Sequence, residues 1–242
     1  MNHLAARHRY GLTATDHRAD GLIKATFALL GNVAYEIPKE AVADRVTDVK
    51  IKTINTDAEL TEECQGPDGM KDYAKLLHHV TTDKNRNNLI VQKLIEDKEH
   101  SCIILSDRLE QLESIRNMLP EDMRELSVYI NGKMTSKKAK EERKNAMDLM
   151  RSGAKKYLFG SYKIAREGLD IPCLDRLFMA SPVKDPAVVE QSVGRIRRTC
   201  TGKTETPVVY DFKDTNIGMY IGWYKKRCTT YRKVGAKIEE DF

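Results

Sequence analysis

The stretch SYKIAREGLDIP, residues 161–172, combines residue types that could bind a nucleotide. It directly follows an apolar run, and ligands bind at the carboxyl ends of strands in parallel sheets. The hydroxyl of Ser161 and the guanidinium of Arg166 suit phosphate contacts, and a carboxylate at Asp170 suits a ribose. However, the Gly168-Leu169-Asp170 sequence taken alone is more often only a turn. A second feature of the sequence is therefore needed before a nucleotide site can be inferred.

A second cluster of polar residues lies at 190–199, in the sequence EQSVGRIRRT. Gln191, Arg195 and Arg198 are spaced by four and three residues, which places them on one face of a helix. A solvated basic end that the helix dipole favours would explain these arginines without any function. Gly194 argues against that explanation, because glycine costs a helix about 1 kcal/mol and needs a reason such as close approach of a ligand or another backbone.

The chain lacks the two elements by which a P-loop enzyme hydrolyses a nucleotide. These are a glycine-rich turn ending in Gly-Lys-Ser/Thr, and an acidic pair at a strand end that holds magnesium. Gly202, Lys203 and Thr204 match the end of such a turn, but Arg197 stands where its first glycine should be. No Asp-Glu pair follows a predicted strand. We therefore expect no ATP hydrolysis by this chain alone.

Composition excludes several further classes of protein. The five cysteines have no CxxC or Cys/His spacing, so neither a metal site nor a disulfide framework is predicted. No apolar stretch approaches the roughly 18 residues that span a membrane, and no signal peptide is evident, so we expect a cytoplasmic protein. Residues 195–242 hold 11 Lys and Arg against 6 Asp and Glu, which accounts for the whole net charge of +5. This basic excess among tyrosines fits either a polyanion partner or an ordinary solvated helix.

The elements that must position these residues alternate between strands and helices. The predicted buried strands are 101–106, 127–131, 156–160, 176–180 and 207–212. The predicted helices are 108–119, 137–150 and 185–198, the last with Asp185 as N-cap and Pro186 in the first turn. This alternation predicts an α/β domain over 84–213, with a parallel sheet and helices on both faces.

The flanking residues do not repeat this pattern. We expect a strand at 33–37 in a first segment, residues 1–38, and a linker with an added hairpin or helix over 39–83. Residues 214–242 are expected to form a C-terminal basic helix. The apolar positions of this helix recur at spacings of three and four. We expect its basic side chains to be solvated, namely Lys225, Lys226, Arg227, Arg232 and Lys233.

Together the two polar clusters resemble motifs V and VI of superfamily 2 helicases. RYGLTAT at 9–15 resembles motif III, IILSDR at 103–108 resembles motif IV, and YINGK at 129–133 resembles the strand and loop that follow it. The resemblance covers nearly the whole chain and is nearest to phage and restriction-type members, followed by excision-repair helicases. Two residues depart from the family pattern. Tyr162 replaces a polar residue, and Asp16 stands where proline often follows Thr-Ala-Thr.

The resemblance implies a RecA-like fold and a function. In the family, two RecA-like domains bind ATP between them and nucleic acid across their tops. Residues 1–38 would be the tail of the first domain, and the first domain, on the same or a partner chain, would supply most contacts to ATP and Mg²⁺. The partner would be DNA, single-stranded or duplex, with RNA not excluded.

The resemblance also assigns roles to individual residues. Arg195 and Arg198 would be catalytic arginine fingers that reach the γ-phosphate. Thr13 and Thr15 would couple the ATP site to the nucleic-acid site. The ATP-binding residues would be Gly168, Asp170 and Gln191. The nucleic-acid contacts would be Ser106, Arg108, Gly132, Lys133 and Ser161.

Two other classes of function compete with a motor domain. A non-catalytic nucleic-acid-binding or regulatory module could share the fold, although it would have no use for two arginines aimed at a γ-phosphate. A dinucleotide-binding enzyme is disfavoured because no predicted strand is followed by Gly-x-Gly-x-x-Gly. We therefore interpret the chain as the C-terminal motor domain of an ATP-dependent helicase or translocase.

Overall fold

The computed structural model describes residues 10–12, 23–38, 41, 46–61, 64, 72–130, 137–166 and 169–240, the side chains of 137–139 and 240 excepted. The chain divides into two compact units, Met1–Ala43 and Asp44–Phe242. In the first unit, helix α1 (Ile23–Leu30) buries none of its side chains. All of the elements described below belong to the second unit.

The second unit is built on one parallel sheet. Its described strands are β1 (Lys50–Thr56), β2 (Cys102–Leu105), β3 (Ser127–Ile130), β4 (Tyr157–Gly160), β5 (Arg176–Met179), β6 (Val208–Asp214) and β7 (Lys237–Glu240). They pair in the order β3-β4-β2-β5-β6-β1-β7, and every pairing is parallel. All five predicted strands are present, and the predicted α/β class is confirmed.

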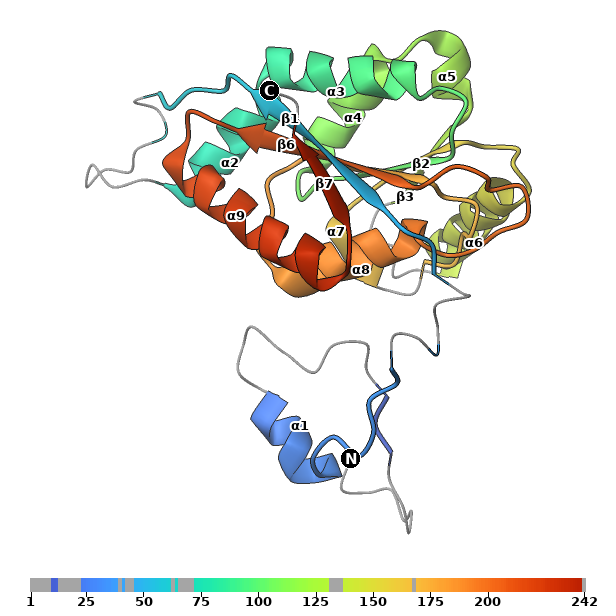
Figure 1. Cartoon of the computed structure of the whole chain (residues 1–242). Coiled ribbons are helices and arrows are strands. Elements are labelled where there is room, and N and C mark those ends of the chain that lie inside the picture. The colour runs from blue at the N-terminus through green and yellow to red at the C-terminus, as the bar shows by residue number, and fades with distance from the viewer. Residues whose placement is uncertain are drawn as a thin grey trace. The chain divides into compact units, whose positions relative to one another are not determined.

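Helices cover both faces of the sheet (Figure 1). They are α2 (Tyr73–Thr82), α3 (Lys84–Glu96), α4 (Leu109–Met118), α5 (Glu121–Glu125), α6 (Lys137–Arg151), α7 (Tyr162–Arg166), α8 (Pro186–Ile196) and α9 (Gly218–Lys233). Successive strand residues face opposite sides, so Ile103 packs with α6, α7 and α8 while Ile104 packs with α3 and α4. The strands are buried on both faces, which explains why they appear in the sequence as continuous apolar runs.

Helix α8, which carries the arginines, begins as its sequence predicts. The side chain of Asp185 accepts a hydrogen bond of 2.9 Å from the amide of Ala187, and Pro186 occupies the first turn. Val189, Val193 and Ile196 on its inner face are buried against the sheet. The outer face of α8 is thereby fixed in direction, and it holds Gln191 and Arg195. The helix ends at Ile196, so Arg198, expected on the same helical face, lies beyond the helix instead.

Two expectations about the flanks are wrong. Residues 33–37 form no strand, because their backbone has no described neighbouring strand with which to pair. Residues 39–83, expected to be a linker with an added hairpin or helix, do contain the helix α2, but they also contribute β1, which lies inside the sheet between β6 and β7. The sheet therefore extends beyond the predicted limits of 84–213 on both sides, with β7 at one edge.

Candidate functional site

Arg195 reaches from α8 to the segment that contains Asp170. Its Nε donates to the carbonyl of Ala165 at 2.7 Å, and its Nη1 donates to the carbonyl of Leu169 at 3.0 Å. Burial lowers the pKa of Arg195, and the charge of Arg198 adds to this effect. Arg195 thus joins the two polar clusters that the sequence singled out.

Arg198 already has a carboxylate partner. Its Nη1 forms an ion pair with Oδ1 of Asp170. The two side chains are 38% and 62% exposed, so water screens the attraction strongly. Arg151 also contacts this loop, donating from Nε to the carbonyl of Asp170 at 2.7 Å. Arg198 and Asp170 therefore lie together at a surface, where an incoming ligand could separate them at little cost.

Arg197 has a structural role instead. Its Nε donates to the carbonyl of Thr47 and its Nη1 to the carbonyl of Val234, each at 2.8 Å. The amide of Thr47 in turn donates to the carbonyl of Arg197 at 2.8 Å, and Val46 forms a bridge with Arg198. The segment before β1 and the end of α9 thereby hold the arginine-bearing end of α8 in place.

The outer face of α8 has groups that the described residues leave unsatisfied. A Cβ atom placed on Gly194 would meet no described atom within 4 Å, and this glycine is exposed. The Oε1 atom of Gln191 is buried without a described hydrogen-bond partner. An unpaired buried acceptor is costly, so this face is suited to receive a donor from outside the unit.

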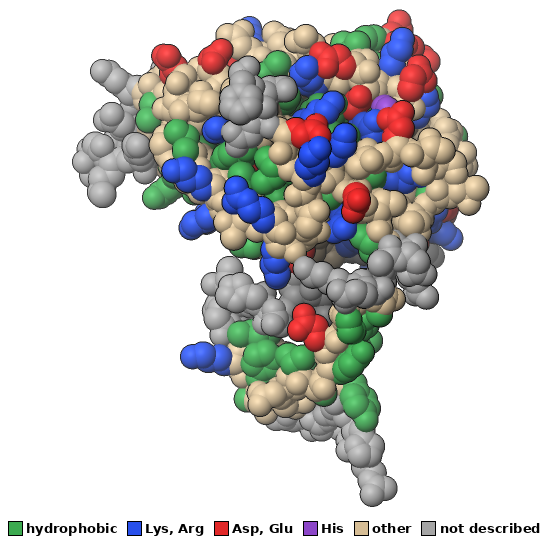
Figure 2. Space-filling view, in the orientation of Figure 1, with side chains coloured by type: hydrophobic (Ala, Val, Ile, Leu, Met, Phe, Trp, Pro, Cys, Tyr) green, Lys and Arg blue, Asp and Glu red, His purple; other side chains and the backbone are tan. Residues whose placement is uncertain are grey.

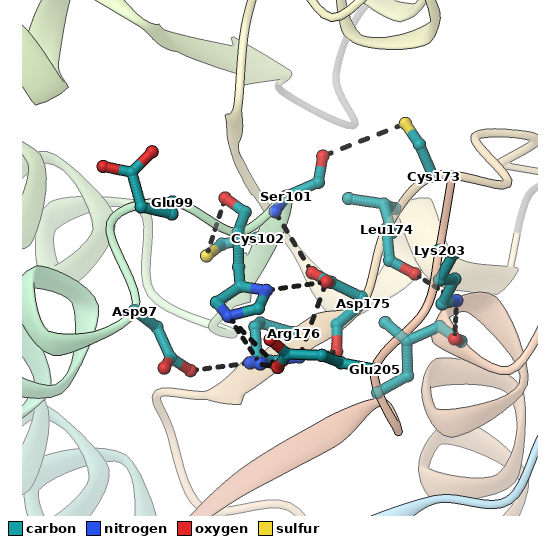
Figure 3. Close-up of polar contacts among 12 residues, drawn as sticks. Asp97, Glu99, Ser101, Cys102, Cys173, Leu174, Asp175, Arg176, Lys203 and Glu205 are labelled. Carbon is teal, nitrogen blue, oxygen red and sulfur yellow. Dashed lines mark hydrogen bonds and ion pairs between the residues drawn. The ribbon is translucent and has the colours of Figure 1, made fainter. Parts of the chain in front are cut away.

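Lys203 does not belong to a phosphate-binding loop. Its ammonium donates to the carbonyl of Leu174 at 2.7 Å (Figure 3). It also donates to the carbonyls of Arg198, at 3.0 Å, and Ile196. Burial lowers the pKa of Lys203 to about 8. The Gly-Lys-Thr sequence therefore supplies a side chain that satisfies backbone carbonyls at the end of α8.

The described members of the predicted nucleic-acid contacts, Ser106, Arg108 and Ser161, lie at the carboxyl edge of the sheet. Ser106, directly after β2, is fully buried, and its hydroxyl donates to Oε1 of Gln111 at 2.7 Å while accepting from the amide of Arg108 at 3.0 Å. Contact between the hydroxyl and a phosphate is therefore not available in this conformation, and Ser106 instead positions Arg108. The Nε of Arg108 has no described hydrogen-bond partner, and Ser161, after β4, is partly exposed.

Five predicted site residues lie outside the described part of the chain: Thr13, Thr15, Gly132, Lys133 and Gly168. Within the described residues, no group of three His, Cys, Asp or Glu side chains could hold a metal ion. None of the described helices is long and apolar enough to cross a membrane.

The buried charges of the unit were missed by the sequence analysis. Arg176 at the start of β5 is 4% exposed, and it donates to Asp97 at 2.8 Å and Glu205 at 2.9 Å (Figure 3). In β6, Asp211 pairs with Arg227 and Asp214 with Arg86, all four side chains being at most 3% exposed. The charged residues inside apolar strand sequences were the available signal, since a buried charge requires a partner.

Comparison with known proteins identifies the domain. Residues 85–200 match the family described as Helicase conserved C-terminal domain. The chain is 25% identical over 245 residues to a protein of Acanthamoeba polyphaga mimivirus assigned as an ATP-dependent RNA helicase, covering 98% of this chain and 44% of that protein. It is 29% identical over 207 residues to a protein of Sulfolobus islandicus filamentous virus assigned as a helicase, covering 81% and 36%. The chain thus spans about half or less of the length of these relatives.

Solved structures show the same fold at low sequence identity. UvsW of T4 has a TM-score of 0.58 at 18% identity, covering 80% of this chain and 41% of UvsW. S. cerevisiae Dbp5 bound to RNA and ADP BeF3 has a TM-score of 0.60 at 14% identity, covering 93% of this chain and 50% of Dbp5. The fold is therefore RecA-like, and residues 85–200 of this chain match the helicase conserved C-terminal domain.

Proposed function

We propose that this chain supplies the second motor domain of an ATP-dependent DNA helicase or translocase, similar to the phage and restriction-type members of superfamily 2. The observation that carries this proposal is the outer face of α8. Arg195 lies there beside the exposed Gly194 and the unpaired Oε1 of Gln191, and Arg198 lies two residues past the end of the helix, paired with Asp170. These groups are suited to contact ATP that a first motor domain holds against them.

The two arginines would act on the γ-phosphate. Hydrogen bonds to two carbonyls fix the guanidinium of Arg195, and its Nη2 has no hydrogen-bond partner among the described residues. Arg198 would exchange Asp170 for phosphate oxygens, leaving that carboxylate to bind the ribose. Such fixed positive charge stabilises the charge that develops on the transferring group. Carboxylates of the first domain would hold Mg²⁺.

The first unit supports the presence of a first motor domain. Its described residues expose five large apolar side chains by more than half, namely Tyr10, Leu12, Val33, Tyr35 and Ile37. Clustered exposed apolar residues of this kind indicate a surface that another part of a protein covers. We infer that residues 1–38 are the tail of a RecA-like domain whose remainder would cover them. Thr13 and Thr15 would couple that domain to nucleic acid.

The nucleic acid would run along the carboxyl edge of the sheet. The Nη2 of Arg108, which donates to the carbonyl of Ala74 at 3.3 Å in an exposed position, would turn to a phosphate there, and we propose that Ser161, Gly132 and Lys133 complete the phosphate contacts. Such contacts are independent of sequence and weaken steeply with salt. DNA is the proposed substrate. One relative is assigned as an RNA helicase, so binding should be measured with both DNA and RNA of the same sequence.

The test is phosphate release by a polypeptide that joins this chain to a first motor domain. Arg195→Ala should leave ATP binding in place and lower nucleic-acid-stimulated turnover by roughly three orders of magnitude. Arg195→Lys should restore little, because a point charge does not reproduce the planar contact of guanidinium with phosphate. The matched control is Arg232→Ala, which removes an exposed arginine of α9 and should not change turnover.

One observation favours the alternative of a non-catalytic module. Arg198 already pairs with Asp170, and Arg195 already binds two carbonyls, so both arginines could be purely structural. In that case Arg195→Ala would lower the melting temperature of this chain and leave turnover of the joined polypeptide unchanged. That result would contradict the motor assignment, whereas lost turnover in a folded variant supports it.

A further inference from the structure

We propose that Trp223 and Lys184 form a platform on which one base of a single-stranded nucleic acid stacks. This inference rests on the proposed function, in which the carboxyl edge of the sheet binds nucleic acid, and it adds a base contact to a track of phosphate contacts. Trp223 lies in the second turn of α9 and is partly exposed, while Lys184 is exposed in the loop between β5 and α8.

The two side chains already lie against each other. The ammonium of Lys184 is 5.5 Å from the centre of the Trp223 ring. On another side, the ring of Tyr220 meets Trp223 edge-on, with centroids 5.0 Å apart and planes at 66°. Tyr220 is buried and therefore supports the indole. Because Lys184 is exposed, its ammonium can leave the face of the Trp223 ring and move toward a phosphate when a base stacks on that face.

Buried contacts fix this arrangement before any ligand binds. Arg227 lies one helical turn after Trp223 and is only 2% exposed. Its Nε and Nη2 bind the two oxygens of Asp211 at 2.8 and 2.7 Å, and its Nη1 donates to the carbonyl of Val183 at 2.9 Å. Val183 directly precedes Lys184, so Arg227 joins the helix to the loop. A rigid platform loses little entropy when a ligand binds.

The platform is continuous with the proposed track. Ser181, in the same loop as Lys184, accepts a hydrogen bond from the amide of Asp107 at its Oγ, 2.9 Å away. Its carbonyl accepts from the hydroxyl of Tyr162 at 2.7 Å. Asp107 and Tyr162 lie two residues after the ends of β2 and β4, next to Arg108 and Ser161. The loop therefore connects the phosphate contacts at both strand ends to Trp223.

The charge around the platform suits a polyanion. Helix α9 contains no Asp or Glu but carries Lys225 and Lys226 just after Trp223. Figure 2 shows Lys and Arg side chains over α9. Basic residues that bind the backbone, together with an aromatic ring that stacks with a base, are the chemistry of single-strand binding. Bases in a duplex are already stacked on each other, so the proposed ligand is single-stranded.

The test uses the fluorescence of this chain, in which Trp223 is the only tryptophan. Titration with an oligothymidylate at low salt should quench its emission in a saturable way. An abasic oligonucleotide of equal length should bind, as measured by anisotropy, yet cause little quenching. Trp223→Ala should weaken oligothymidylate binding by about 5- to 150-fold, the range for loss of one base–aromatic stack, while Trp223→Phe should retain most of the affinity.

Two further variants separate stacking from charge and from general effects. Lys184→Ala should reduce the magnitude of the slope of the log binding constant against log salt concentration by about 0.7. This is the value for one phosphate contact on a single strand. Tyr35→Ala removes an exposed aromatic residue of the first unit and should change neither the affinity for oligothymidylate nor the quenching of tryptophan emission. If anisotropy shows binding but abasic DNA quenches equally, or Trp223→Ala binds like the parent, the platform is refuted and the proposed function stands. If no oligonucleotide binds, the proposed nucleic-acid track itself fails.

Discussion

Replacing Arg227 by alanine should strongly destabilise the Asp44–Phe242 unit. The sequence predicts this arginine to be solvated with the other basic residues of α9, but the structure buries it at 2% exposure. Burial alone would lower the pKa of Arg227, and the charge and hydrogen bonds of Asp211 more than offset this, so that the pKa is raised. The pair thus stabilises the charged form of Arg227.

The magnitude follows from the charge that the substitution leaves behind. Asp211 is 1% exposed and would retain only the hydroxyl of Tyr231, at 2.7 Å, as a side-chain donor. Removal of one partner of a buried ion pair costs about 3 to 5 kcal/mol. In proteins of this size each kcal/mol lowers the melting temperature by about 2 to 4 °C, so the expected decrease is about 6 to 20 °C.

Thermal unfolding followed by circular dichroism measures this decrease. Arg232→Ala is the matched control, because it removes an exposed arginine from the same helix and should change stability by less than about 0.5 kcal/mol. A double variant, Arg227→Met with Asp211→Asn, should recover part of the loss, since no unpaired charge remains. A melting temperature of Arg227→Ala within about 2 °C of the parent would refute the reasoning.

Two further perturbations test the end of α8. Gly194→Ala should raise the free energy of unfolding of this chain by about 1 kcal/mol in urea titrations, because the added Cβ meets no described atom within 4 Å; a decrease would reveal packing at this face. Burial lowers the pKa of Lys203 from 10.5 to about 8, so between these pH values the unfolded chain keeps a proton that the folded chain releases. The unfolding free energy of the parent relative to Lys203→Met should therefore rise from pH 8 to pH 10, and a constant difference would contradict the lowered pKa.

Features that depend on neighbouring residues were predictable from the sequence. Continuous apolar runs predicted the strands from β2 to β6, because a strand buried on both faces needs an apolar side chain at nearly every position. Asp185 and Pro186 predicted the start of α8 because capping involves only the first turn of a helix. The order of the polar motifs predicted the helicase family, which the match over residues 85–200 confirms.

Features that depend on distant residues needed the tertiary structure. The sequence of β1 contains Thr53 and Thr56, whose hydroxyls are satisfied by Tyr224 and Asp214, more than 150 positions away. Likewise, only the fold brings Asp170 to Arg198 and Asp211 to Arg227. The sequence by itself determined which residues are apolar and which are charged, and so the class of fold and the candidate site. The tertiary structure decided which charges are paired and buried. A buried charge is costly without an opposite charge beside it, and the fold determines which residue lies there.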